Sequence, residues 1–218
     1  MKKIMFNDKY GLTQKVLKGI KTQTRRLILS KTIEKAEQYR VDYFNDTLDN
    51  IPLEDMLINA NQLMGVPSLS YHVGEEVAIA QSYRDILGNE YLPTSIEDEI
   101  IALVKENSEG MSNKMFVRAD LMPHRIKITN IRVERLQDIS EEDCLKEGIE
   151  KINVNDGFGN MLSHWEYLLT YEDKLGRSLQ LGSRFHKEAF SFLIDKTCGI
   201  GTWESNPYVF VYDFELTQ

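Results

Sequence analysis

The six residues Lys21-Thr22-Gln23-Thr24-Arg25-Arg26 carry one primary amine, two hydroxyl groups and two guanidinium groups. No acidic residue occurs between Lys9 and Ile33, a window that holds seven Lys and Arg side chains. An amine beside hydroxyl groups can support nucleophilic chemistry, and the same cations can bind a phosphate or a carbonyl oxygen. A short motif of this kind is more often only a basic surface turn, so a function needs further support from the chain.

Three residues could together perform acid–base and nucleophilic steps. Lys21 must lose its proton to act as a base, and a free lysine does so near pH ~10.4. Burial and neighbouring cations such as Arg25 and Arg26 both lower a lysine pKa. Thr24 would then be a usable nucleophile, and Glu147 could donate a proton to a leaving amine or orient the substrate. Glu147 could equally be an exposed carboxylate at a helix end, since the sequence alone does not bring it near Lys21.

Length and composition predict an ordinary soluble globular protein. The chain has 218 residues, of which 42% are hydrophobic and 28% charged, enough for a self-sufficient core. Apolar runs such as residues 100–104 are too short to span a bilayer, and the amino terminus does not resemble a secretory signal. Cys144 and Cys198 lie in no paired spacing, so we expect free thiols in a reducing cytoplasm.

The charge is unevenly distributed along the chain. The net charge is −8, yet residues 9–33 carry +7 and residues 114–135 carry +4, which leaves −19 for the remainder. A locally basic face on an acidic body suits a selective site for an anionic or polar ligand. It does not suit a general coat on long nucleic acids, which needs many phosphate contacts. The sequence does not tell whether the two basic windows meet in space.

Metal and nucleotide-loop motifs give no signal. The four histidines, His72, His124, His164 and His186, are dispersed and form no metal-binding spacing. Residues 199–201, Gly-Ile-Gly, lack the strand and helix of a nucleotide loop, so a turn before the last strand is expected. We therefore predict no metal and no organic cofactor.

The apolar periodicity predicts alternating helices and strands in one α+β domain. Ser140 with Asp143 predicts a capped short helix that ends at Gly148, with Ile139 and Cys144 packed together at its start. Ser95 with Asp98 predicts another helix start. Helices are expected at residues 12–20, 96 to about 107, 140–147, 161–175 and 185–194, and strands at residues 77–81, 115–119, 125–133 and 208–216.

Residues 19–26 resemble the G-x-K-T-x-T-x-R signature of the ASCH domain family, which belongs to the PUA-like superfamily. Further stretches agree with that family in order and character. Residues 73–77 resemble the start of a barrel strand, residues 126–147 a strand followed by the family's short helix, and residues 206–216 its closing strand. Several motifs in order are more specific than the first one alone, so the resemblance favours a functional site.

The resemblance implies one domain spanning residues 1–218, a PUA-like β-barrel with flanking helices. Because the chain is larger than small bacterial ASCH proteins, helical insertions are expected at about 31–70, 84–113 and 151–204. Some of those small proteins are N4-acetylcytidine amidohydrolases with a catalytic Lys, Thr and Glu. By motif, the resemblance places these roles on Lys21, Thr24 and Glu147. Arg26 matches the Arg of the motif.

Three hypotheses about function follow. The first is an ASCH protein whose basic cleft binds RNA or a modified nucleoside and hydrolyses an N4-acylated cytidine amide, with Thr22, Arg25 and Arg26 as substrate contacts. The second is a non-catalytic RNA- or nucleobase-binding module, with Tyr83 or Phe116 as a stacking surface. The third is an accessory protein whose acidic insertions bind another protein. No membrane partner is predicted, and the oligomeric state is left open.

Overall fold

The computed structural model describes residues 1–43, 52–64, 69–87, 92–106, 108–154, 164–172 and 177–217. The strands are β1 (Lys3–Ile4), β2 (Gln23–Leu27), β3 (Glu76–Ile79), β4 (Arg125–Arg135), β5 (Glu150–Val154), β6 (His164–Glu172), β7 (Ser178–Ser183) and β8 (Tyr208–Thr217). The helices are α1 (Leu12–Leu17), α2 (Ser30–Tyr43), α3 (Leu53–Met64), α4 (Tyr83–Ile86), α5 (Thr94–Lys105), α6 (Glu141–Lys146), α7 (His186–Cys198) and α8 (Thr202–Ser205). None of these helices is long and apolar enough to cross a membrane.

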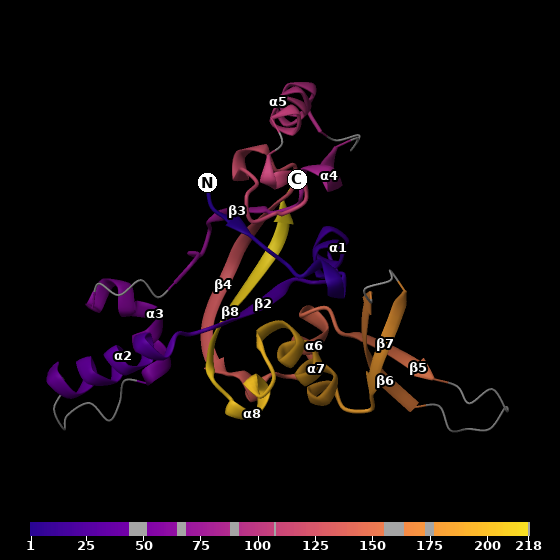
Figure 1. Ribbon diagram of the computed structural model, residues 1–218. Helices are drawn as coiled ribbons and strands as arrows, with labels where there is room; N and C mark the ends of the chain where they lie inside the picture. Colours follow the sequence, from indigo (N-terminus) through magenta and orange to yellow (C-terminus); the bar gives the residue numbers. More distant parts are fainter. Residues whose placement is uncertain are drawn as a thin grey trace.

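The main sheet contains five strands in the order β1-β3-β4-β8-β2. β1 and β3 are parallel, and the other neighbours are antiparallel. The long strands β4 and β8 run side by side through the centre of the molecule (Figure 1). The predicted strands at 125–133 and 208–216 are therefore confirmed, and the mixed α+β class is confirmed with them. Among the described residues no pairing joins β1 to β2, so the main sheet is not closed into a barrel.

β8 carries the centre of the hydrophobic core. Its residues from Val209 to Tyr212 are all buried, because helices and loops cover both faces of the sheet there. α1 and α7 contribute to this main core, and a smaller second core forms around α4 and α5. The edge strand β2 is thus held against β8, and this pairing positions residues 23–27.

The helix predicted at residues 161–175 is wrong for the part of that range that the structure describes. Within the described part of that range, residues 164–172 form β6, the middle strand of a second sheet with order β5-β6-β7. Tyr167, Leu169 and Tyr171 alternate along the strand and pack into the main core, so a period of two governs the segment. α7 packs against β6 and β7, and its prediction at 185–194 is confirmed.

Two other predictions about local structure are wrong. Residues 115–119 form turns rather than a strand, and the Lys3 Nζ donates hydrogen bonds to Met115 O and Val117 O, both at 2.6 Å. α5 begins after Pro93 without a side-chain cap, so the Ser95 capping box is absent. The predicted helix end, Asn107, lies outside the described residues.

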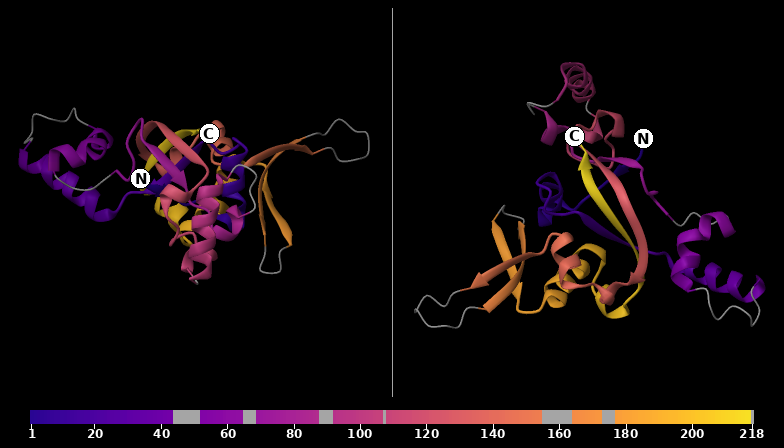
Figure 2. Two further views of the ribbon diagram at one scale, coloured as in Figure 1. Left: turned by 90° about the horizontal axis from the view of Figure 1, so that it is seen from above. Right: turned by 180° about the vertical axis from the view of Figure 1, so that it is seen from behind.

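The insertions surround the main sheet on different sides. α2 and α3 extend to one side, α4 and α5 lie at one end, and the sheet of β5, β6 and β7 extends to the opposite side (Figures 1 and 2). The first insertion is helical where it is described, as predicted. In its described part, the insertion at 151–204 contains strands as well as α7 and the start of α8, so the expectation of a helical insertion is wrong there.

Candidate functional site

The segment at residues 19–26 links α1 to the edge strand β2. Gly19 adopts φ 69°, a left-handed conformation that glycine reaches without steric cost, and lets the chain turn out of the helix. β2 then pairs with β8 from Gln23 to Leu27. Because side chains alternate along a strand, Thr24 and Arg26 share one face of β2, and Gln23 and Arg25 share the other.

The short helix α6 brings the carboxylate to this segment. The Ser140 Oγ accepts a hydrogen bond from the Asp143 N–H at 3.1 Å, which caps the helix as predicted. Gly148, with φ 98°, follows the last turn, and Glu147 is the last residue before it. The Thr22 N–H donates to Lys146 O at 2.9 Å, which ties the end of α6 to the start of β2.

Lys21 and Glu147 form a buried ion pair. The Lys21 Nζ lies 2.5 Å from Glu147 Oε2, and the two side chains are 1% and 5% exposed. The same Nζ donates to Gln23 O at 2.7 Å and to Glu147 O at 3.0 Å, so all three N–H groups of the ammonium have acceptors. Burial lowers the pKa of Lys21 most strongly; Glu147 opposes this shift, and the charges of Arg26 and Arg25 add to it.

Arg25 is held by acidic residues far away in sequence. Its guanidinium contacts Glu134 at 2.5 Å, Asp143 at 3.1 Å and Glu147 at 3.1 Å, and its side chain is 1% exposed. Arg132 adds contacts to Glu134 and Asp143. β4 and α6 therefore supply the negative charge that the sequence around residues 9–33 lacks, and Arg25 fixes the orientation of the Glu147 carboxylate.

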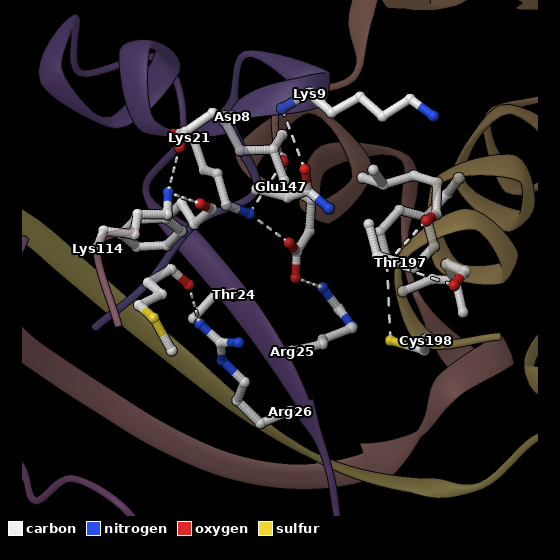
Figure 3. Close-up of a pocket in the computed structure, with 17 residues that line it drawn as sticks. Asp8, Lys9, Lys21, Thr24, Arg25, Arg26, Lys114, Glu147, Thr197 and Cys198 are labelled. Atoms are coloured by element: carbon white, nitrogen blue, oxygen red, sulfur yellow. Dashed lines mark hydrogen bonds and ion pairs between the residues drawn. The ribbon is translucent and has the colours of Figure 1, made fainter. Parts of the chain in front are cut away.

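A cavity of about 530 Å³ opens beside this pair (Figure 3). Lys21, Thr24 and Glu147, which come from distant parts of the chain, all line it. The remaining lining comes from the amino-terminal segment, β2, Lys114 and α7: Met5, Phe6, Asn7, Asp8, Lys9, Leu12, Arg25, Arg26, Lys114, Phe190, Leu193, Ile194, Thr197 and Cys198. The structure thus brings the three predicted residues to one pocket, while their chemical roles stay a prediction.

Three of the predicted substrate contacts lie outside this cavity lining. Thr22 does not line it. Tyr83 is 1% exposed in the second core, where its hydroxyl accepts a hydrogen bond from the Arg118 N–H at 3.0 Å, so it offers no stacking surface. Phe116 is about half exposed but also lies outside the lining. Tyr83 therefore cannot serve as the predicted stacking surface, whereas a stacking role for Phe116 stays a prediction.

Sequence reasoning missed the wall that α7 provides and the cation Lys114. Phe190, Leu193 and Ile194 form an apolar side of the cavity, whereas the sequence predicted only a helix over residues 185–194. Lys114 contacts Asp8 at 2.7 Å beside the cavity. The two basic windows of the sequence thus meet at this pocket, a point that the charge distribution had left open.

Metal and thiol chemistry find little support in the described residues. They hold no group of three or more His, Cys, Asp or Glu side chains arranged to bind a metal ion. Both cysteines are free. Burial raises the pKa of the Cys144 thiol to about 12, so this thiol stays protonated at neutral pH.

Comparisons of the chain with protein-family models, with curated proteins and with solved structures find no match. The similarity of residues 19–26 to the ASCH signature therefore remains a resemblance. What the pocket does follows from its own geometry and chemistry: a buried amine, a carboxylate and a hydroxyl beside a cavity with an apolar wall and several cations.

Lys21 should make the stability of the fold depend on pH in the alkaline range. The pKa of Lys21 in the folded chain is lowered below the ordinary 10.5 that it has in the unfolded chain. At a pH between these two pKa values, the unfolded chain binds more protons than the folded chain. Raising the pH through this interval then stabilises the fold. We expect the free energy of unfolding of the wild type, minus that of Lys21→Met, to rise with pH in urea titrations. A difference that stays flat or falls would contradict the lowered pKa.

Proposed function

We propose that this protein binds a modified nucleoside or nucleobase in the cavity beside Lys21 and hydrolyses an N4-acylated cytidine amide. The observation that carries the proposal is the buried Lys21–Glu147 pair beside Thr24. Among the described residues the Thr24 hydroxyl has no hydrogen-bond partner, so it is free to react with a ligand. The series of ASCH-like motifs along the chain, including β8 as a closing strand, supports the same proposal and a relationship to PUA-like folds.

The ion pair can supply both an acid and a base with a single proton. At 2.5 Å, a proton can move from the Lys21 Nζ to Glu147 Oε2, which leaves a neutral amine and a carboxylic acid. Burial favours this neutral form, because water no longer solvates either charge. Arg25 lies 3.1 Å from Glu147 Oε1 and favours the carboxylate. The neutral Lys21–Glu147 pair is therefore the minor form, and it is the form that reacts.

The reaction then proceeds in two steps. The Thr24 Oγ1 attacks the acyl carbon and gives its proton to the neutral Lys21 amine. The bond from the acyl carbon to N4 breaks, and the leaving amine takes the proton held by Glu147, which frees cytidine. Water then attacks the acyl–Thr24 ester, returns the hydroxyl to Thr24 and releases the carboxylic acid.

The cavity has the size and lining that such a ligand needs. Its volume of about 530 Å³ lies within the range of roughly 300–1,000 Å³ usual for small-molecule sites. The side chains of Leu193 and Ile194 contribute an apolar wall against which a flat base could pack. Arg26 lies at the same cavity and provides hydrogen-bond donors for polar groups of the ligand.

Binding without turnover is the second candidate, and one observation favours it. The Lys21 ammonium already donates to three acceptors of the protein, which is the arrangement of a structural lysine. In that case the pair would only shape the cavity, and the protein would retain a nucleobase without changing it. The two candidates differ in whether any product forms.

Chromatography of cytidine released from N4-acetylcytidine distinguishes them. We expect release by the wild type, loss of release in Lys21→Ala, and wild-type release in Lys18→Ala. Lys18 is an exposed cation of the same segment that lies outside the cavity lining, so it controls for loss of charge alone. No release from this or other N4-acylated cytidines by a folded wild type would refute hydrolysis and leave the binding function.

A further inference from the structure

Five cations line the cavity, and three of them are already saturated by the protein. Lys21 donates to three oxygen atoms. Arg25 contacts three carboxylates. Lys114 donates to Phe6 O and Thr13 Oγ1 and pairs with Asp8 at 2.7 Å. None of these three can bind an anionic ligand without giving up a contact that the fold uses.

Arg26 differs from its neighbour Arg25. It donates one hydrogen bond, from Nη2 to Met5 O at 2.9 Å, and within the described residues it has no carboxylate partner. A guanidinium has five N–H donors, so several remain for a ligand. In Figure 3 its head group lies on the side of the cavity that also bears Thr24. The half-buried position of Arg26 limits the water that can solvate this charge.

Lys9 is a second cation at the cavity that has no ion pair in the described part of the chain. Its side chain is exposed and points away from Arg26 in Figure 3, and its Nζ lies 5.7 Å from the centre of the Tyr10 ring. The acidic side chains of the lining, Asp8 and Glu147, are both engaged with other cations. Among the described cations of the lining, Arg26 is therefore the one that is both half-buried and left with spare donors.

We propose that Arg26 forms a phosphate site, so that the ligand is a phosphate-bearing nucleotide rather than a free nucleoside. This inference rests on the proposed function for the identity of the base, but its charge argument stands on the cavity alone. A guanidinium with spare donors matches a phosphate, which it can bind through two parallel hydrogen bonds. The phosphate comes from a free mononucleotide or from the backbone of an RNA strand.

Equilibrium binding tests the site without requiring turnover. Cytidine, cytidine 5′-monophosphate and a short cytidine-containing oligoribonucleotide are titrated into the wild type, Arg26→Gln and the control Lys18→Gln. We expect the monophosphate to bind at least about tenfold more tightly than cytidine in the wild type and in Lys18→Gln. Arg26→Gln should lose this preference, because it loses the charged hydrogen bonds to the phosphate. Equal affinity of the wild type for all three ligands would overturn the proposal.

The oligoribonucleotide identifies the source of the phosphate. If the oligoribonucleotide binds more tightly than the monophosphate, and if this binding weakens in Arg26→Gln, the site is assigned to an RNA backbone. Binding no tighter than that of the monophosphate assigns it to a free nucleotide. Both results support a phosphate site, and the preference should shrink as salt is raised because ions screen the attraction.

Turnover separates this inference from the proposed function. The ratio of kcat/KM for N4-acetylcytidine 5′-monophosphate over that for N4-acetylcytidine should fall in Arg26→Gln. If both rates fall equally, Arg26 stabilises the transition state of the amide instead, and the phosphate site is refuted while hydrolysis stands. If nothing is hydrolysed but Arg26-dependent preference for the monophosphate persists, hydrolysis is refuted and the phosphate site stands.

Discussion

Replacing Thr24 by valine should lower kcat for hydrolysis of N4-acetylcytidine by at least about a thousandfold, because it removes the proposed nucleophile. The change exchanges a hydroxyl for a methyl group of similar size. Since the Thr24 hydroxyl has no partner among the described residues, no buried donor or acceptor is left behind. Ligand affinity and the free energy of unfolding should therefore stay close to those of the wild type.

Two further variants make this result specific. Thr24→Ser keeps a hydroxyl and should retain measurable hydrolysis. Thr22→Val removes the other hydroxyl of the segment, which does not line the cavity, and should hydrolyse at the wild-type rate. Steady-state kinetics of the purified proteins provides the comparison. Thr24→Val with wild-type kcat would show that another group, or water, attacks the amide.

Arg25→Met should destabilise the fold by about 3–5 kcal/mol, the range typical of removing one partner from a buried ion pair. The change leaves Glu134, Asp143 and Glu147 without the guanidinium that contacts all three. The neighbouring change Arg26→Met removes the same group from a half-buried site with a single hydrogen bond. Its cost should be about 1 kcal/mol or less.

Urea unfolding of both variants beside the wild type measures these free energies. The pair is well matched, because the two arginines are adjacent in β2 and differ mainly in which face they occupy. If the two substitutions cost the same, Arg25 would not be the residue that holds the acidic cluster together. The division into a structural Arg25 and a ligand-binding Arg26 would then be wrong.

Local signals predicted the elements that carry the site. The capping pair Ser140 and Asp143 placed the start of α6, and Gly148 placed its end, because both depend on backbone hydrogen bonds within a few residues. The alternation along β8 was equally local. Through the resemblance to ASCH proteins, Glu147 could be named beside Lys21 and Thr24 before their common pocket was known.

Interactions between distant segments could not be predicted in the same way. Arg25 contacts Glu134 and Asp143 across more than 100 residues, so nothing in residues 19–26 indicates that its charge is already compensated. Arg26, one residue later, looks identical in sequence. Sequence reasoning therefore assigned both arginines to substrate binding, and the structure was needed to show that only Arg26 has donors to spare.

The error at β6 has a similar physical origin. Leu168 and Leu169 suggest one helical face, but Tyr167, Leu169 and Tyr171 suit a strand equally well. Pairing with β5 and β7 and packing against α7 select a strand instead of a helix for residues 164–172. The sequence of the segment alone does not reveal these contacts. The wall of the cavity that α7 forms depends on this sheet.

Mass spectrometry of the protein quenched during turnover of N4-acetylcytidine tests the central claim most directly. We predict that one acetyl group accumulates on the peptide containing Thr24, that it disappears when substrate is exhausted, and that Thr24→Val never acquires it. Release of cytidine from a protein that carries no acetyl group on Thr24 at any time would contradict the account.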